Sequence, residues 1–287
     1  MKRIIYALIA VALISCKKDK TTVITPTVTQ VQEQEIHTDW YGSWVGNFNA
    51  EKYNENSEDV SYVNKISIVI KKITSDIVTG QSVVAGNSRP LTGTISGTDN
   101  NAFVLKEPGD NKYDGTFTFR IDGDTLSGKW ISNNKKVTVT ERSFKLVKKQ
   151  FTYYPQLMLP EERDYIDYSH TKTEEIVEED GTVSNENLYR QASESVRTIN
   201  ASTQELTEDQ LKNLKKLDLE IIRNTIFARH GYTFKKKSVR QFFDPVDWYV
   251  PVSEDVSADL TKLEKDNIVL LKRFEKYAED NYDSFGR

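Results

Sequence analysis

Hydrophobic residues follow three patterns along the chain, and each pattern predicts a different kind of structure. Residues 4–14 form one uninterrupted apolar run. Between about residue 37 and residue 150, apolar and polar residues alternate in short segments, which is typical of strands with one buried face. In residues 205–287, apolar residues recur every three or four positions, which predicts helices. The segment 151–204 between them is polar and acidic, and we interpret it as a connector.

The alternating segments predict an antiparallel β-barrel or sandwich of about eight strands in residues 37–150. In the clearest of them, the alternate apolar positions are Ile66, Ile68 and Ile70, and then Phe117, Phe119 and Ile121. Asp122-Gly123 lies between two such segments and predicts a tight hairpin. In the connector, a hairpin bent around Gly181 is one interpretation of two short strand-like segments.

Two capping boxes mark helix starts in residues 205–287. Thr207 precedes Gln210 by three positions, and Thr261 precedes Glu264 in the same way. In such a box the hydroxyl accepts a hydrogen bond from one free backbone amide, and the second side chain accepts one from another. The predicted apolar face of the last helix consists of Leu263, Leu270, Phe274 and Tyr277.

The start of the chain joins Met1-Lys2-Arg3 to the apolar run and to Ser15-Cys16, which is the layout of a secretory signal peptide. The run is shorter than the roughly 20 apolar residues that a membrane-spanning helix needs. The stretch from Leu13 to Cys16 (LISC) resembles the bacterial lipobox. The resemblance implies cleavage after residues 1–15 and lipidation of Cys16. We therefore expect a lipid-anchored protein, on the outer membrane and either periplasmic or surface-exposed, with residues 16–36 as a flexible tether.

Composition narrows the classes of function. The 287-residue chain has a formal charge of −4, which becomes −6 without Lys2 and Arg3. An acidic chain is a poor match for nucleic acid, whose phosphates require a basic surface. Cys16 is the only cysteine, so the rest of the chain can form neither a disulfide nor a cysteine-ligated metal site.

The first predicted strand contains Gly42-Ser43-Trp44, and Gly-x-Trp in this place resembles the calycins, the lipocalin-like barrels. The resemblance implies that Arg142 or Lys145 covers Trp44 at the base of the barrel. An eight-stranded barrel is either filled by side chains or holds one small ligand. Trp44 and Trp130 are therefore either core residues or part of a ligand cavity.

Acidic residues gather in the predicted turns of this barrel: Asp110, Asp114, Asp122 and Asp124. Their spacing does not match an EF-hand, whose ligands are drawn from a loop of about 12 residues. Turn chemistry explains them, and we predict no metal site.

Residues 221–234 (IIRNTIFARHGYTF) closely resemble the signature of the YARHG domain, with Phe227 in place of the usual Tyr. The downstream elements agree with the family: Phe242-Phe243, Trp248-Tyr249-Val250-Pro251, Glu264 and Asn267-Ile268. This family is a small bacterial module, regarded as extracytoplasmic, for which no catalytic residues are defined. The resemblance implies a role at the cell envelope, with peptidoglycan or an envelope protein as the expected partner.

The motif can be structural. Gly231 suits the left-handed turn that ends a helix, and His230 then lies near the last carbonyl groups. The residues to which we assign a structural role are Arg223, Asn224, Phe227, Ala228 and Gly231. We hypothesise that Arg223 or Arg229 pairs with an aspartate and so ties this helix to the segment 242–248. The available partners are Asp244, Asp247 and Asp266.

The alternative is a binding site, in which Arg229, His230 and Trp248 line a cleft that holds a carboxylate or a sugar. Both interpretations remain open at this point, because a buried and a cleft-lining arginine look alike in a sequence.

Three classes of function remain. We favour a non-catalytic envelope lipoprotein without a cofactor, whose YARHG module binds a cell-wall or protein partner. The alternative is a carrier that holds a small apolar ligand in the barrel. An enzyme is least favoured, since the chain has no Gly-x-Ser-x-Gly, His-Glu-x-x-His or phosphate-loop motif and no cysteine after Cys16.

The lipid anchor yields a direct test. Replacing Cys16 with Ala removes the thiol that would carry the lipid, so we expect a protein that is either uncleaved or released from the membrane fraction. Metabolic labelling with a palmitate analogue and cell fractionation measure both outcomes. A Cys16→Ala variant that is processed and labelled like the wild type would contradict the assignment.

Overall fold

The structure is a computed structural model, and it describes residues 34–57, 60–282 and 285. The predicted signal peptide and Cys16 lie outside these residues, so lipidation stays a prediction. Residues 34–287 form one compact unit. In the described part of the chain, no helix is both long and apolar enough to cross a membrane.

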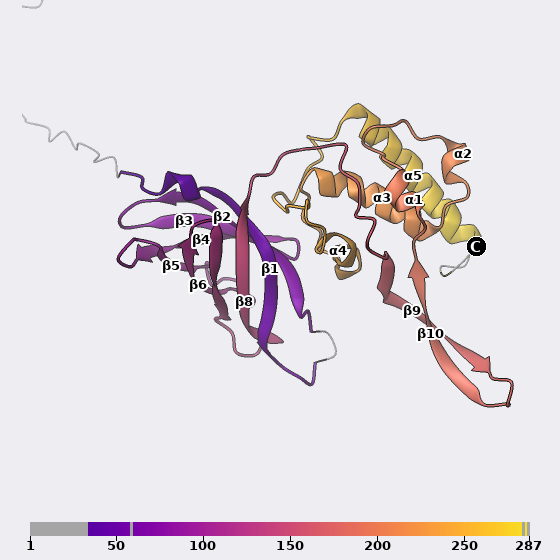
Figure 1. The fold of residues 1–287 in the computed structure, drawn as a ribbon, viewed down its shortest axis with the longest axis horizontal. Coiled ribbons are helices and arrows are strands. Elements are labelled where there is room, and N and C mark those ends of the chain that lie inside the picture. Colours follow the sequence, from indigo (N-terminus) through magenta and orange to yellow (C-terminus); the bar gives the residue numbers. More distant parts are fainter. Residues whose placement is uncertain (1–33, 58–59, 283–284, 286–287) are drawn as a thin grey trace, which may run out of the picture. The chain divides into compact units, whose positions relative to one another are not determined.

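The alternating segments form a closed antiparallel barrel of eight strands, in which each strand pairs with its neighbour in sequence and β1 pairs with β8 (Figure 1). After a short 3₁₀ helix, η1 (Thr38–Trp40), the strands are β1 (Gly42–Tyr53), β2 (Val63–Ile73), β3 (Val78–Val84), β4 (Asn87–Ser96), β5 (Ala102–Lys106), β6 (Gly115–Asp122), β7 (Thr125–Ser132) and β8 (Val139–Lys149). The predicted fold class is therefore confirmed for this part. The tight hairpin at Gly123 is also confirmed, because Asp122 pairs with Thr125 across it.

Aromatic side chains fill the interior of the barrel. Phe48, Phe117 and Phe144 contact one another at ring-centroid distances of 5.9–6.1 Å, and Phe103 stacks on Phe119 at 4.8 Å. Trp44 and Trp130 belong to the same core cluster. Of the two forms that an eight-stranded barrel can take, this is the form filled by its own side chains.

The residue that covers Trp44 is Lys148, and our expectation of Arg142 or Lys145 was wrong. The strand register places Trp44 opposite Lys148, whose ammonium lies 6.0 Å from the indole. Arg142 lies instead over the ring of Phe48, and it donates hydrogen bonds to the carbonyls of Phe48 and Ser61. Lys148 lies a few residues further along β8 than Arg142 and Lys145, and the sequence alone does not reveal which of them the strand register places beside Trp44.

The connector contains a two-stranded antiparallel hairpin, β9 (Ile166–Val177) and β10 (Val183–Gln191), and Gly181 takes a positive φ of 83° in its turn (Figure 1). Asp167 holds the base of the hairpin and is fully buried. It accepts hydrogen bonds from Arg190 at 2.6 and 2.9 Å and from Gln241 at 2.8 Å. These bonds tie the hairpin to the helical region.

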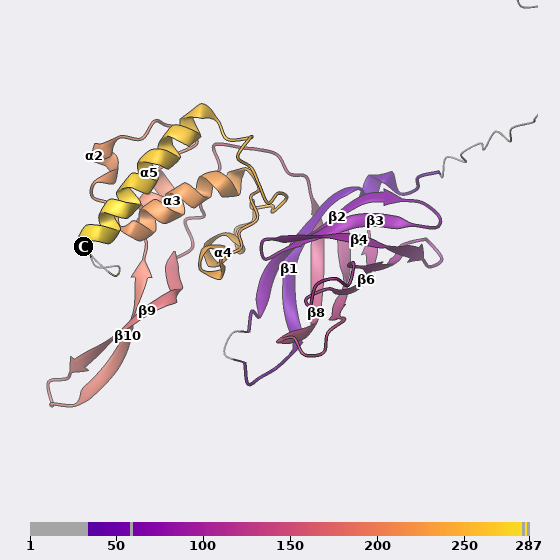
Figure 2. The same cartoon turned by 180° about the vertical axis from the view of Figure 1, so that it is seen from behind.

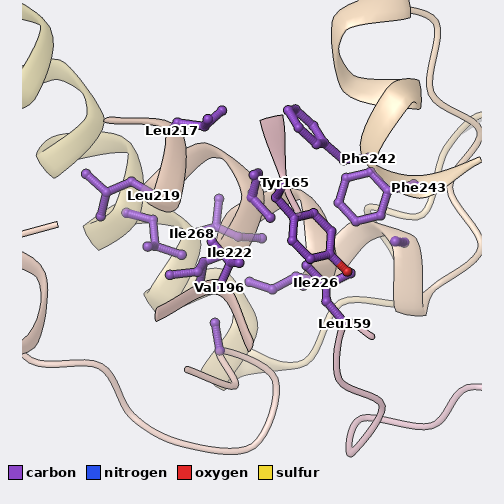
Figure 3. Packing of buried hydrophobic residues seen from close by; sticks show 14 of the residues in the cluster. Leu159, Tyr165, Val196, Leu217, Leu219, Ile222, Ile226, Phe242, Phe243 and Ile268 are labelled. Carbon is purple, nitrogen blue, oxygen red and sulfur yellow. The ribbon is translucent and has the colours of Figure 1, made fainter. Parts of the chain in front are cut away.

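Five α-helices follow in the described residues: α1 (Ser195–Thr198), α2 (Glu208–Leu211), α3 (Lys216–Arg229), α4 (Lys237–Phe243) and α5 (Lys262–Asn281). The two long helices, α3 and α5, pack against each other (Figure 2). Leu219, Ile222 and Ile226 of α3 enter one core cluster with Val196 of α1 and Ile268 of α5 (Figure 3). The predicted small helical domain is confirmed by these elements.

Both predicted capping boxes are confirmed, at the starts of α2 and α5. The predicted apolar face of α5 is partly right, because Leu270 and Phe274 pack against the core, but it is wrong at its C-terminal end. Tyr277 is 50% exposed, whereas the buried residues of α5 are Glu264, Asn267, Ile268, Leu271 and Ala278. Two of these are polar, and they are buried because each has partners in the core. The Asn267 amide, for example, donates to the carbonyls of Ala201 and Gln204.

Candidate functional site

The end of α3 has the hydrogen bonds of a Schellman motif, which fixes the chain direction at the YARHG signature. The amide of Gly231 donates to the carbonyl of Ala228, and the amide of Tyr232 donates to that of Phe227. Gly231 has a φ of 71°, and a Cβ atom there would lie 2.6 Å from a Val252 methyl carbon. Both the backbone angle and the close packing therefore require glycine.

His230 follows directly and is buried, with 6% of its surface exposed. Its Nε2 atom lies 2.9 Å from Oε2 of Glu264. The ring of Tyr153 stacks on the imidazole at a centroid distance of 4.2 Å, and its hydroxyl donates to Oε1 of Glu264 at 3.0 Å. One carboxylate therefore contacts both the end of α3 and a residue that precedes the helical region by about 40 positions.

Glu264 is also the third residue of α5 and completes its capping box. Its carboxylate accepts a hydrogen bond from the backbone amide of Thr261 at 2.9 Å, and the Thr261 hydroxyl accepts one from the backbone amide of Glu264. Burial alone would raise the pKa of Glu264. Hydrogen bonds from His230, from Ser202 and from the Thr261 amide outweigh burial and lower this pKa to about 2. The carboxylate is therefore held in its charged form.

Arg229 and Trp248 bind the backbone of the same preceding segment. The Arg229 Nε–H donates to the carbonyl of Leu157 at 2.7 Å, and the Trp248 indole N–H donates to that of Met158 at 2.8 Å. Arg229 also donates to the Ser202 hydroxyl at 3.0 Å. Burial lowers the pKa of Arg229 to about 10, and the charge of Glu264 offsets part of this effect.

We call Arg229, His230, Trp248 and Glu264 the connector clamp, because together they hold residues 153–158. The three candidate binding residues do meet in space, as a binding site would require. What they bind is the chain itself, and Arg229 is only 2% exposed. In the described residues, their polar groups bond to the connector, to one another and to the start of α5, and they line none of the grooves discussed below.

Arg223 pairs with Glu275 of α5, and our hypothesis of an aspartate partner was wrong. Two guanidinium nitrogens contact the two carboxylate oxygens at 2.5 and 3.1 Å, and a third donates to the Asn224 side-chain oxygen at 3.2 Å. Arg223 lies nearly two helical turns before Arg229 and His230 and faces α5. Two of the three proposed aspartates pair locally, Asp244 with Arg240 and Asp266 with Lys262.

A surface groove of about 510 Å³ lies beside this ion pair, and we call it the motif groove. Three signature residues line it: Arg223, Asn224 and Phe227. The lining also includes Tyr232, Lys235, Lys236, Val239 and residues 254–257. A second groove of about 640 Å³ shares Arg223, Asn224 and Lys236. The signature residues therefore lie on two faces of α3: one face packs inside the protein, and the other is open to solvent.

Sequence reasoning missed Tyr153 and Glu275. Tyr153 lies in a segment without a regular pattern, and its tertiary contacts with His230 and Glu264 identify it. Glu275 follows Glu264 by 11 positions, which is close to three helical turns, so a helical reading of the charged face of α5 could have found it.

Within the described residues, no group of three or more His, Cys, Asp or Glu side chains is arranged to hold a metal ion. The acidic turn residue Asp114 accepts two hydrogen bonds from Arg89, at 2.8 and 2.9 Å, and Asp110 pairs with the same guanidinium. These carboxylates therefore stabilise a turn of the barrel.

Comparison with family models matches residues 195–276 to the YARHG domain. The match begins at α1, whereas the sequence placed the start of the module at residue 205. It includes α3, both sides of the motif groove and most of α5. Neither the comparison with curated proteins nor the comparison with solved structures found a match.

The clamp makes a prediction about pH. The pKa of Glu264 falls from its ordinary value of 4.5 to about 2 on folding, so its contribution is complete above pH 4.5 and is lost as the pH falls toward 2. We expect Glu264→Gln to lower the free energy of unfolding by about 2 kcal/mol at pH 7. We also expect the difference from the wild type to shrink between pH 4.5 and pH 2.

Urea denaturation at several pH values measures this difference, and Glu205→Gln at an exposed position of the same module is the control. A constant difference between wild type and Glu264→Gln across this pH range would show that the carboxylate charge does not stabilise the fold.

Proposed function

We propose that this chain is a non-catalytic lipoprotein of the bacterial cell envelope, and that its YARHG module binds a cell-wall or protein partner in the motif groove. The observation that carries the proposal is the double use of the signature. The polar groups of Arg229 and His230 bond to other parts of the chain, whereas Asn224 and Phe227 of α3 line an open groove. A binding role therefore falls to the groove.

The lining of the motif groove combines apolar rings with both signs of charge. Phe227 and Tyr232 lie with their ring centroids 5.9 Å apart, and Lys235 pairs with Glu254 at 3.4 Å. Aromatic anchors surrounded by polar groups are typical of binding hot spots. Peptidoglycan stem peptides carry carboxylates, amides and amines along a short chain, so their chemistry is complementary to this mixture.

Rigid support favours binding, because a preformed groove loses less conformational freedom when it takes up its partner. The bidentate Arg223–Glu275 pair holds one wall of the groove against α5. The Schellman motif fixes the turn from Phe227 to Tyr232 on the other wall. In this proposal, lipid on Cys16 anchors the protein and residues 16–36 form the spacer to the membrane.

The carrier alternative gains no support from the barrel interior, where aromatic rings occupy the space that a ligand would need. The proposal requires neither a cofactor nor nucleic acid, and it assigns no catalytic residue.

The binding role is testable with purified peptidoglycan sacculi and the full-length protein in a nonionic detergent. The double variant Lys235→Ala/Lys236→Ala removes two exposed cations from the groove. We expect retention on sacculi to fall about fivefold, which corresponds to about 1 kcal/mol.

The matched control is Lys265→Ala/Lys272→Ala, which removes two exposed lysines from α5 outside the motif groove. Retention of this control should equal that of the wild type. If the wild type is not retained, or if both double variants are retained equally, peptidoglycan is not the partner of the groove.

A further inference from the structure

A third groove, of about 690 Å³, lies between the outside of the barrel and the segment that contains α4. Strands β1, β2 and β8 form one wall, and residues 237–247 form the other. Five cationic side chains line it: Lys65, Lys145, Lys149, Lys237 and Arg240. The acidic side chains in the lining are Asp244 and Asp247. The groove therefore carries an excess of positive charge in a protein that is acidic as a whole.

The strand register arranges part of this charge in a row. Asn47 of β1 pairs with Lys65 of β2 on one side and with Lys145 of β8 on the other. Directly opposed residues on neighbouring strands point to the same face, with Cβ atoms about 5 Å apart. The Asn47 side chain therefore lies between two lysine side chains on the outer face of the barrel.

The burial of this charge is unusual for the outside of a barrel. Lys65 is 7% exposed, and its ammonium donates to the carbonyl of Val246 and lies 5.4 Å from the ring of Tyr249. Burial and the nearby charge of Lys149 lower the pKa of Lys65 to about 8. Buried ammonium groups need compensating negative charge.

The acidic side chains on the opposite wall balance this positive charge only in part. Arg240 lies 3.7 Å from Asp244, yet its buried Nε–H has no hydrogen-bond partner among the described residues. Burial raises the pKa of Asp244 to about 6, which weakens it as a counter-charge. The wall therefore has a donor without an acceptor, facing a barrel surface rich in lysine.

We propose that this groove binds a phosphoryl group, supplied either by a soluble phosphate ester or by a phospholipid headgroup. The phosphate oxygens take up the excess positive charge and accept hydrogen bonds from Arg240, from Asn47 and from the surrounding lysines. Lysine acts toward phosphate as a point charge. Several lysines are therefore better balanced by the double negative charge of a phosphate than by the single charge of a carboxylate. The volume lies within the range of small-ligand sites.

The test uses the full-length chain in a nonionic detergent, titrated calorimetrically with inorganic pyrophosphate at low ionic strength. We expect saturable binding. The double variant Lys145→Gln/Lys237→Gln should weaken it about tenfold or more, because charge-assisted hydrogen bonds are lost. Both lysines are exposed, so the fold should tolerate the change, and the melting temperature without ligand checks this.

The matched control, Lys106→Gln/Lys112→Gln, changes the net charge equally at exposed positions of the barrel outside the groove. It should bind pyrophosphate like the wild type. Equal weakening in both double variants would reduce the effect to general charge screening and overturn the proposal, as would the absence of pyrophosphate binding to the wild type.

A second titration distinguishes the sources of the phosphoryl group. Dihexanoyl phosphatidic acid is compared with dihexanoyl phosphatidylcholine, whose phosphate is masked by choline. Selective binding of the phosphatidic acid, lost in Lys145→Gln/Lys237→Gln, identifies a headgroup site. Pyrophosphate binding without binding of either lipid identifies a soluble phosphate ester.

Discussion

One buried carboxylate, that of Glu264, joins the parts of the helical module. It accepts hydrogen bonds from the start of its own helix and from Tyr153 in the connector, and it lies against His230 at the end of α3. A buried charge is costly unless several partners satisfy it at once. Losing any one partner leaves part of the hydrogen-bonding capacity of this buried carboxylate unsatisfied, which destabilises the fold.

This constraint gives the YARHG signature a physical meaning. Arg229 and His230 hold the connector to the helices, and Gly231 supplies the turn that places them. The opposite face of the same helix is then free to form the motif groove, supported by the Arg223–Glu275 pair. Residues that look like a binding cluster in the sequence thus build the scaffold, and the open surface lies on another face of the same helix.

Much of the fold could be predicted from the sequence, because strand alternation and capping boxes are local signals. The apolar positions Ile66 and Phe117 lie inside the barrel as expected. The failures concern polar residues that tertiary contacts bury. Lys65 occupies the outer face of β2 and is nevertheless buried, since Val246 and Tyr249 lie against it.

The site was harder to predict for the same reason. Hydrophobic periodicity placed the buried face of α5 on Leu263, Leu270, Phe274 and Tyr277, yet Glu264 and Asn267 also enter the core, through hydrogen bonds. Ion-pair partners depend on how two helices rotate against each other, so the sequence offered several aspartates for Arg223 and missed Glu275. Local patterns therefore recover the elements, and long-range polar contacts decide which faces meet.

A double-mutant cycle between Tyr153→Phe and Glu264→Gln tests the central claim most directly. Tyr153→Phe removes the donor of the hydrogen bond between the connector and α5, and Glu264→Gln replaces its charged acceptor with a neutral amide oxygen; both keep the size of the side chain. Equilibrium unfolding of the wild type, the two single variants and the double variant gives the coupling. The clamp predicts a coupling free energy of about 1–2 kcal/mol. Additive effects, within about 0.3 kcal/mol, would contradict it.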